Sequence, residues 1–167
     1  MTHLSRTLVS LTFAATAAAL PVSAQELDAP RPIAAGESLW AEELTWMEVR
    51  DKVAAGWTTV IIGTGGIEQN GPYLVGGKHN RVLEIVLPEI AREMGNALLA
   101  PIVKFVPEGA IEPGPTGHMR YPGTVSVEEE TFRALLRDIA RSYRAHGFTD
   151  IVLLGDSGGN QDRKSVV

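Results

Sequence analysis

The sequence TTVII at residues 58–62, followed by GGIEQNGPYL at residues 65–74, decides the fold. A short β-branched run that ends in glycines is typical of a buried strand that opens into a loop at its C-terminal end. Open α/β sheets bind their ligands at that end of their strands. Glu68 is therefore predicted to lie where the chemistry of such a domain takes place.

Predicted helices and strands alternate on both sides of this first strand. This alternation favours a parallel sheet with helices on both faces, so we expect one three-layer α/β/α domain over residues 44–161. The mostly parallel sheet brings the loops that follow its strands to one edge. The periodicity predicts helices over residues 45–56, 80–94 and 126–147, and further strands over residues 97–105 and 151–154.

Two of the predicted helices begin with a capping-box pattern, TWME at residues 45–48 and SVEE at residues 126–129. In the middle helix Pro88 indicates either a kink or a later start. The helical spacing predicts that apolar side chains of the last two helices face the core, namely Val82, Ile85, Val86, Leu87 and Ile90, and then Phe132, Leu135, Leu136, Ile139 and Tyr143.

The composition excludes several classes of partner and site. The chain carries 15 Lys and Arg against 20 Asp and Glu, with no basic run, which argues against nucleic acid and anionic membranes as partners. It has no cysteine, so neither a disulfide framework nor a thiolate metal site can form. Any metal ion must be held by His, Asp, Glu and neutral oxygen ligands.

The N-terminal segment predicts export. Residues 1–24 combine Arg6 near the start, an apolar run over residues 8–20 and the small-residue pattern VSA at residues 22–24, which is the layout of a cleaved signal peptide. We therefore expect a periplasmic or secreted protein that begins at Gln25 and has no membrane contact after cleavage. Residues 25–43, rich in Pro, Ala and Gly, are predicted to form an extended N-terminal arm.

The other end of the sequence predicts an interrupted domain. DRKSVV at residues 162–167 follows a glycine-rich loop and has no periodicity. We expect these six residues to be a non-native tail after a break at about Gln161, which leaves the α/β domain incomplete at its C-terminus. The alternative is a short native polar tail.

Two glycine-rich motifs resemble sites of other classes. GDSGG at residues 155–159 is the sequence of the nucleophile loop in chymotrypsin-like serine proteases, but the alternation of strands and helices and the absence of cysteine argue against that fold. GTGG at residues 63–66 lacks the Lys-Ser/Thr ending of a phosphate-binding loop. Neither motif therefore changes the interpretation of the domain.

Four segments together resemble the creatininase (creatinine amidohydrolase-like) family, over residues 44–160. They are TWMEV at residues 45–49 with Gly56 and Trp57, EQNGP at residues 68–72, YPGT at residues 121–124 after His118, and GGN at residues 158–160. The resemblance implies a creatininase-like fold, hydrolysis of a C–N bond in a small cyclic or linear amide, and divalent metal ions, commonly zinc or manganese. It also implies a homo-oligomer for the full-length protein.

The resemblance also implies which residues form the site. Glu68 is the only metal ligand of the family that we find unchanged. Asn70, Tyr73 and Ser157 stand where the family has histidines, and His79 stands where it has an aspartate. We assign Asn70, Tyr73 and Ser157 to substrate binding.

An exchange of ligand types between two loops indicates an altered metal site. His79 replaces the aspartate of the first loop, while Asp156 lies beside the lost histidine after the last strand. Carboxylates and imidazole suit zinc or manganese, so we predict at most one ion, held by Glu68, His79 and Asp156. His118 is predicted to act on the substrate, either by orienting it or by donating to a developing oxyanion, and a merely exposed histidine is the alternative.

Two functions follow from these observations. The first is an exported, metal-dependent amidohydrolase that acts on a small amide. The alternative is a degenerate member of the family that keeps the fold and binds a small ligand or a protein partner without hydrolysis, because the expected histidines are missing.

Overall fold

The computed structural model describes residues 26–157. The predicted signal peptide over residues 1–24, the GGN motif at residues 158–160 and the predicted non-native tail over residues 162–167 lie outside the described residues. Residues 26–32 form a unit of their own, in which a turn is closed by the Ala29 N–H and the Glu26 carbonyl (3.0 Å), and the rest belongs to a second unit that begins at Ile33. Within residues 26–157, no helix combines the length and apolar character that crossing a membrane requires.

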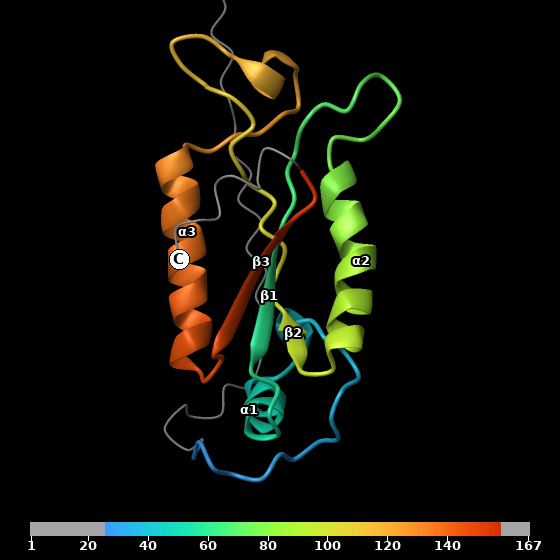
Figure 1. Cartoon of the computed structure of the whole chain (residues 1–167), viewed down its shortest axis with the longest axis vertical. Coiled ribbons are helices and arrows are strands. Elements are labelled where there is room, and N and C mark those ends of the chain that lie inside the picture. The colour runs from blue at the N-terminus through green and yellow to red at the C-terminus, as the bar shows by residue number, and fades with distance from the viewer. Residues whose placement is uncertain (1–25, 158–167) are drawn as a thin grey trace, which may run out of the picture. The chain divides into compact units, whose positions relative to one another are not determined.

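The second unit is built on a three-stranded parallel sheet (Figure 1). The strands are β1 (Thr59–Thr64), β2 (Ala97–Leu99) and β3 (Asp150–Gly155), and their order is β2-β1-β3. Thr59 pairs with Ala97 on one side and with Asp150 on the other. Strand β1 is central and all six of its residues are buried, as expected for a β-branched strand covered on both faces.

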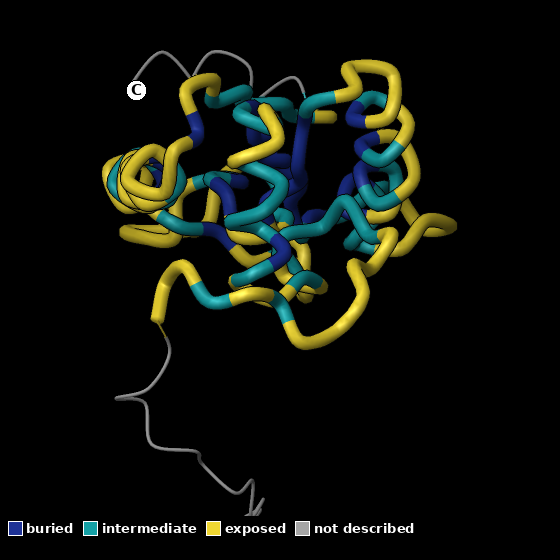
Figure 2. The backbone as a smooth tube through the Cα atoms, turned by 90° about the horizontal axis from the view of Figure 1, so that it is seen from below, coloured by how far each residue is buried: buried dark blue, intermediate teal, exposed yellow. Residues whose placement is uncertain are grey.

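Helices cover both faces of the sheet. Val60 and Ile62 of β1 belong to one core cluster with side chains of α3 (Glu129–Ala145), whereas Ile61 belongs to a second cluster with side chains of α2 (Lys78–Met94). Successive residues of a strand point to opposite faces, so one strand serves both clusters. Figure 2 shows the buried residues gathered between the helices. The predicted three-layer α/β/α fold is confirmed.

The first helix, α1 (Trp46–Ala54), begins at the predicted capping box. Thr45 Oγ1 accepts from the Glu48 N–H (3.3 Å), and Glu48 Oε2 accepts from the Thr45 N–H (2.7 Å). The predicted arm is partly structured before it. Trp40 forms a parallel bridge with Leu99, and a short 3-10 helix, η2 (Ala41–Glu43), follows.

The second predicted capping box is wrong. Helix α3 begins at Glu129, and its N-cap residue Glu128 makes no side-chain capping bond. Ser126 instead accepts a hydrogen bond from the Glu108 N–H (2.9 Å) and donates one to the Gly109 carbonyl (2.8 Å). The serine hydroxyl therefore satisfies the backbone of an earlier loop, which a pattern confined to four consecutive residues cannot reveal.

Helix α2 begins two residues before its predicted start and continues through Pro88 without ending. Three side chains predicted to face the core are exposed instead, Ile85 and Val86 in α2 and Leu135 in α3. A helix that packs against a sheet buries only the side chains along one face, and this face is narrower than the set of apolar residues that the spacing predicts.

The second predicted strand is shorter than expected but stays beside β1. Regular pairing ends at Leu99, and the chain then continues extended past Pro101, with hydrogen bonds from the Val103 N–H to the Gly63 carbonyl (2.9 Å) and from the Gly65 N–H to the Val103 carbonyl (3.0 Å). The loops after all three strands lie at the same end of the sheet (Figure 1). The carboxyl edge is therefore where the site residues can meet.

Candidate functional site

Two glycines let the loop after β1 pass close to α2 and to a neighbouring loop. A Cβ on Gly65 would lie 2.0 Å from Asn80 Oδ1, and a Cβ on Gly66 would lie 2.2 Å from Glu108 Oε1. Asn80 accepts from the Gly66 N–H (3.1 Å) and donates to the Gly66 carbonyl (2.9 Å). This pair of bonds fixes the start of the loop against the first turn of α2.

The same loop closes on itself beyond Glu68. The Glu68 N–H donates to the Gly76 carbonyl (3.0 Å), and Asn70 Nδ2 donates to the carbonyls of Glu68 (3.0 Å) and Val75 (3.3 Å). The amide of Asn70 is therefore used to hold the loop. The Glu68 side chain, by contrast, is only 7% exposed.

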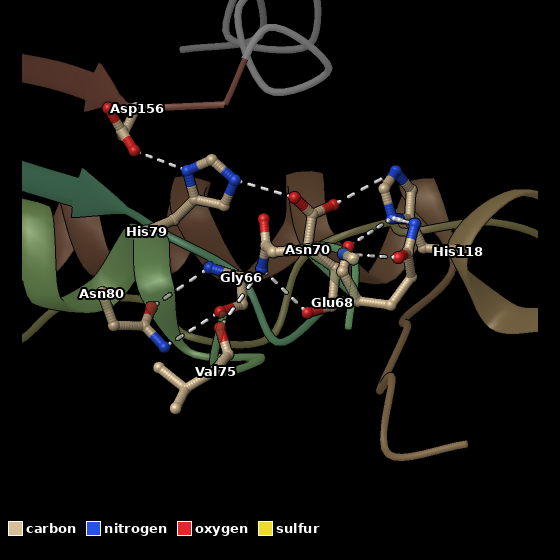
Figure 3. Close-up of polar contacts among 10 residues, drawn as sticks. Gly66, Glu68, Asn70, Val75, His79, Asn80, His118 and Asp156 are labelled. Atoms are coloured by element: carbon tan, nitrogen blue, oxygen red, sulfur yellow. Dashed lines mark hydrogen bonds and ion pairs between the residues drawn. The ribbon is translucent and has the colours of Figure 1, made fainter. Parts of the chain in front are cut away.

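Four side chains lie in a row at the carboxyl edge of the sheet (Figure 3). His79, the second residue of α2, is at the centre: its Nε2 lies 2.7 Å from Glu68 Oε1, and its Nδ1 lies 2.5 Å from Asp156 Oδ2. Asp156 follows β3 directly. His118, in the short 3-10 helix η3 (Gly117–Arg120), places Nε2 3.4 Å from Glu68 Oε2.

The carboxylate of Glu68 thus has an imidazole Nε2 opposite each of its oxygens. The second nitrogen of each ring faces an acceptor: Nδ1 of His118 lies 3.2 Å from the Gln69 carbonyl, and Nδ1 of His79 faces Asp156. The same Nδ1 of His118 also lies 3.5 Å from Gln69 Nε2, an N–H donor, so the contacts of this nitrogen fit either tautomer of the ring.

Glu68 is ionised although it is buried. Burial raises the pKa of the Glu68 carboxyl, but a hydrogen bond with the side chain of Glu108, the hydrogen bond with His79 and the charges of His118 and His79 lower it by more. The pKa of Glu68 therefore lies below its ordinary value of 4.5. The carboxylate therefore stays charged at neutral pH, and its negative charge can attract a metal ion.

These side chains are of types that bind divalent ions, but the distance between His79 and Glu68 is too short for two ligands of one ion. Carboxylate oxygen and imidazole nitrogen are ligands that zinc and manganese both accept. Two such donors on one ion stand about 3.3 Å apart, further than the 2.7 Å between His79 Nε2 and Glu68 Oε1. Within residues 26–157, no three His, Asp or Glu side chains are placed so that they could hold one ion together.

The structure brings the three predicted metal ligands together, but not around one point. Asp156 and Glu68 lie at opposite nitrogens of the His79 ring, whose two lone-pair directions diverge. An ion bound at Nε2 would have Asp156 on the far side of the ring. In this arrangement Asp156 fixes the ring orientation of His79, as carboxylates commonly do for histidines in metal sites, and Glu68 and His79 remain the facing pair.

The other predicted residues differ in their placement. His118 joins the row, as described above. Ser157 is half-buried beside Asp156. Tyr73 is 94% exposed at the tip of the loop, so it does not pack against the row of four. Asn70 uses its side chain on the loop backbone rather than presenting it to a ligand.

Sequence reasoning missed Glu108 and Asn80. Asn80 is buried in the structure. In the sequence it directly follows His79 at the start of a predicted helix, and this position was the available signal. Glu108 lies within VPEGA of the proline-rich and glycine-rich loop, where only His118 was considered. An acidic residue in an apolar stretch was the available signal.

Three comparisons with known proteins identify the family and the fold. The family model described as creatinine amidohydrolase (Creatininase) matches residues 42–165. A creatinine amidohydrolase from Pseudomonas putida is 29% identical over 118 residues, which are 71% of this chain and 44% of that protein. A crystal structure of creatinine amidohydrolase superposes with a TM-score of 0.68 at 27% identity, covering 77% of this chain and 48% of that one.

Other solved creatininase structures match similarly. One described as the Mn form has a TM-score of 0.67 at 28% identity and covers 76% of this chain and 48% of its own. A mutant described as of the Zn-Zn type has a TM-score of 0.62 at 29% identity, covering 71% and 45%. This chain spans less than half the length of the relatives that it matches. With the family model matched over most of its length and the sheet edge arranged as described, the chain belongs to the creatininase family.

Proposed function

We propose that this protein is an exported amidohydrolase that uses a divalent metal ion, zinc or manganese, to cleave a C–N bond of a small cyclic or linear amide. The observation that carries the proposal is the ionised Glu68 carboxylate, which has the Nε2 atoms of His79 and His118 opposite its two oxygens. The creatinine amidohydrolase activity of the relative from Pseudomonas putida and the Mn and Zn forms of the solved creatininases support the choice of reaction and metal.

Glu68 and His79 are the residues that would hold the ion, and His118 Nε2 lies 3.4 Å from the second carboxylate oxygen of Glu68. A bound divalent ion polarises a carbonyl group and activates water near neutral pH. Asp156 accepts from His79 Nδ1–H, which leaves Nε2 directed at Glu68. His118, with a side chain 40% exposed, is accessible to a substrate and can donate to the amide oxygen or to the leaving nitrogen.

The localisation and assembly are part of the proposal. The signal-like segment over residues 1–24 supports export to the periplasm or the medium. We further propose that the full-length protein is a homo-oligomer. Gel filtration at micromolar concentration tests this, and a single peak at the monomer mass would contradict it.

A second candidate function is ligand binding without hydrolysis. It is favoured by the 2.7 Å spacing of Glu68 and His79, which is a hydrogen bond rather than a pair of metal ligands, and by Asn70 and Tyr73 at histidine positions of the family. The two candidates differ in whether a C–N bond is broken.

Hydrolysis of creatinine and of a panel of small linear and cyclic amides tests the choice between them. We expect wild-type protein to release product, Glu68→Gln and His118→Ala to lose at least tenfold in rate, and a chelator to abolish activity. Arg92→Gln, on an exposed surface of α2, is the matched control and should leave the rate unchanged. Binding of an amide without any turnover would favour the second candidate.

A further inference from the structure

Asn80 is a buried polar residue beside the site, and the proposed mechanism does not use it. It is the third residue of α2, directly after His79, and is 6% exposed. Its side chain accepts from the Gly66 N–H (3.1 Å) and donates to the Gly66 carbonyl (2.9 Å) (Figure 3). Gly66 stands two residues before Glu68, so the two segments that meet at this contact are the ones that bring Glu68 and His79 together.

A carboxamide is the side chain that satisfies both backbone groups of Gly66 at once. The Gly66 N–H needs an acceptor and the Gly66 carbonyl needs a donor, and both groups depend on the protein for their partners because Gly66 is buried. An amide carries an acceptor and a donor side by side, whereas a carboxylate only accepts and an ammonium group only donates. The amide is also uncharged, so it leaves the charge of the site unchanged.

The start of α2 has no side-chain cap that could take over this role. Its N-cap residue is Gly77, which makes no side-chain capping bond. Helix starts are commonly fixed by the side chain of the N-cap residue, but here the Asn80 amide ties the first turn to the neighbouring loop instead. His79 belongs to that first turn, so its position relative to Glu68 depends on the same tie.

Gly65 leaves the space that the Asn80 amide occupies. A Cβ at position 65 would lie 2.0 Å from Asn80 Oδ1 and 3.2 Å from the Asn80 backbone nitrogen. The φ of Gly65 is not positive, so its backbone conformation does not require glycine. The absence of a side chain at this position therefore serves the close approach of the strand end to the first turn of α2.

We propose that Asn80 is a positioning residue of this site, whose amide holds the loop after β1 against the first turn of α2 and thereby sets the spacing of Glu68 and His79. The metal-binding part of this inference rests on the proposed function, whereas the positioning of His79 against Glu68 does not. Loss of a group that orients metal ligands typically weakens metal binding by about 10-fold to 100-fold.

Two variants disturb the contact from opposite sides. Asn80→Leu keeps a side chain of similar length and removes both hydrogen bonds, whereas Gly65→Ala keeps Asn80 and fills the space of its Oδ1. Thr45→Ala is the control for a general loss of stability. It weakens the cap of α1, which lies at the other end of the sheet from the site (Figure 1).

Two measurements on the full chain report on the site itself. The first is the ring ¹⁵N and ¹H shifts of His79 at fixed pH in metal-free protein, because they change when the contact between His79 and Glu68 changes. The second is the affinity for zinc by calorimetry. We expect both Asn80→Leu and Gly65→Ala to shift the His79 signals and to weaken zinc binding about 10-fold or more, and Thr45→Ala to do neither.

Unchanged His79 signals in either folded variant would overturn the inference, and so would an unchanged zinc affinity if the wild type binds zinc. Equal changes in Thr45→Ala would overturn it too, because a general loss of stability would then explain them. If Asn80→Leu does not fold, Gly65→Ala decides alone. A wild-type protein that binds no zinc refutes the proposed metal, while the His79 signals still decide the role of Asn80.

Discussion

Glu68 is buried and yet has a lowered pKa, and this combination makes the stability of the fold depend on pH. Desolvation alone would raise the pKa of Glu68, but Glu108, His79 and His118 lower it below 4.5 in the folded protein. Ionised Glu68 therefore stabilises the fold relative to the unfolded chain. The stabilisation is complete above the unfolded value and is lost as the pH falls through the lower folded-state pKa.

The corresponding variant is Glu68→Gln, which removes the titrating group and keeps the shape. We expect the wild type to lose thermal stability more steeply than Glu68→Gln as the pH is lowered below 4.5, because only the wild type must bind this proton. Melting temperatures of both proteins from pH 7 to pH 3 measure the difference. Parallel curves would show that Glu68 does not have a lowered pKa.

Asp156 is the residue whose predicted role changes most in the structure. It faces Nδ1 of His79, opposite the nitrogen that faces Glu68. We expect Asp156→Ala to weaken metal binding without removing it, by about 10-fold to 100-fold, because it fixes the ring rather than binding the ion. Zinc titration of Asp156→Ala checks this, and complete loss of binding would restore Asp156 as a direct ligand.

At the scale of elements, the start of α1 offers a local test of stability. Thr45 and Glu48 satisfy each other's backbone N–H groups, and Glu48 Oε1 also accepts from the Gly36 N–H (2.5 Å). Thr45→Ala should lower the free energy of unfolding by about 1 kcal/mol, because a helix N–H loses its partner. Urea denaturation measures the change, and Thr45→Ser, which keeps the hydroxyl, is the control. Equal losses in both variants would show that the methyl group matters rather than the cap.

The central strand and its flanking helices could be predicted because the signal is local. The run around Val60 and Ile62 is β-branched and ends in glycines, and the stripes of α2 and α3 recur at helical spacing. Details that depend on distant residues could not be predicted. Ser126 has the sequence of a helix cap but binds the backbone of Glu108 and Gly109, and the length of β2 depends on pairing with β1.

In the site, too, the features that depend on local signals could be predicted and those that depend on distant residues could not. Parallel strands made it predictable that the loops carrying Glu68 and Asp156 would meet, and the structure places them on the same histidine. Which nitrogen of His79 each carboxylate faces depends on the orientation of the ring, which spacing does not encode. Glu108 was missed because its contact with Glu68 crosses between loops 40 positions apart in the sequence.

On the scale of the whole molecule, the N-terminal segment predicts a processed protein. The small residues at positions 22–24 suit cleavage after Ala24, so periplasmic material should begin at Gln25. N-terminal sequencing of protein from that compartment checks this. Recovery of Met1 or Thr2 would contradict export by this route.

Metal content tests the central claim most directly. Protein purified without chelators should contain about one zinc or manganese ion per chain, since Glu68 and His79 form one facing pair of donors. His79→Ala should lose that ion, while Arg92→Gln, as a surface control, should retain it. Elemental analysis of the three proteins gives the answer. No stoichiometric metal in the wild type, or the same content in His79→Ala, would contradict the account.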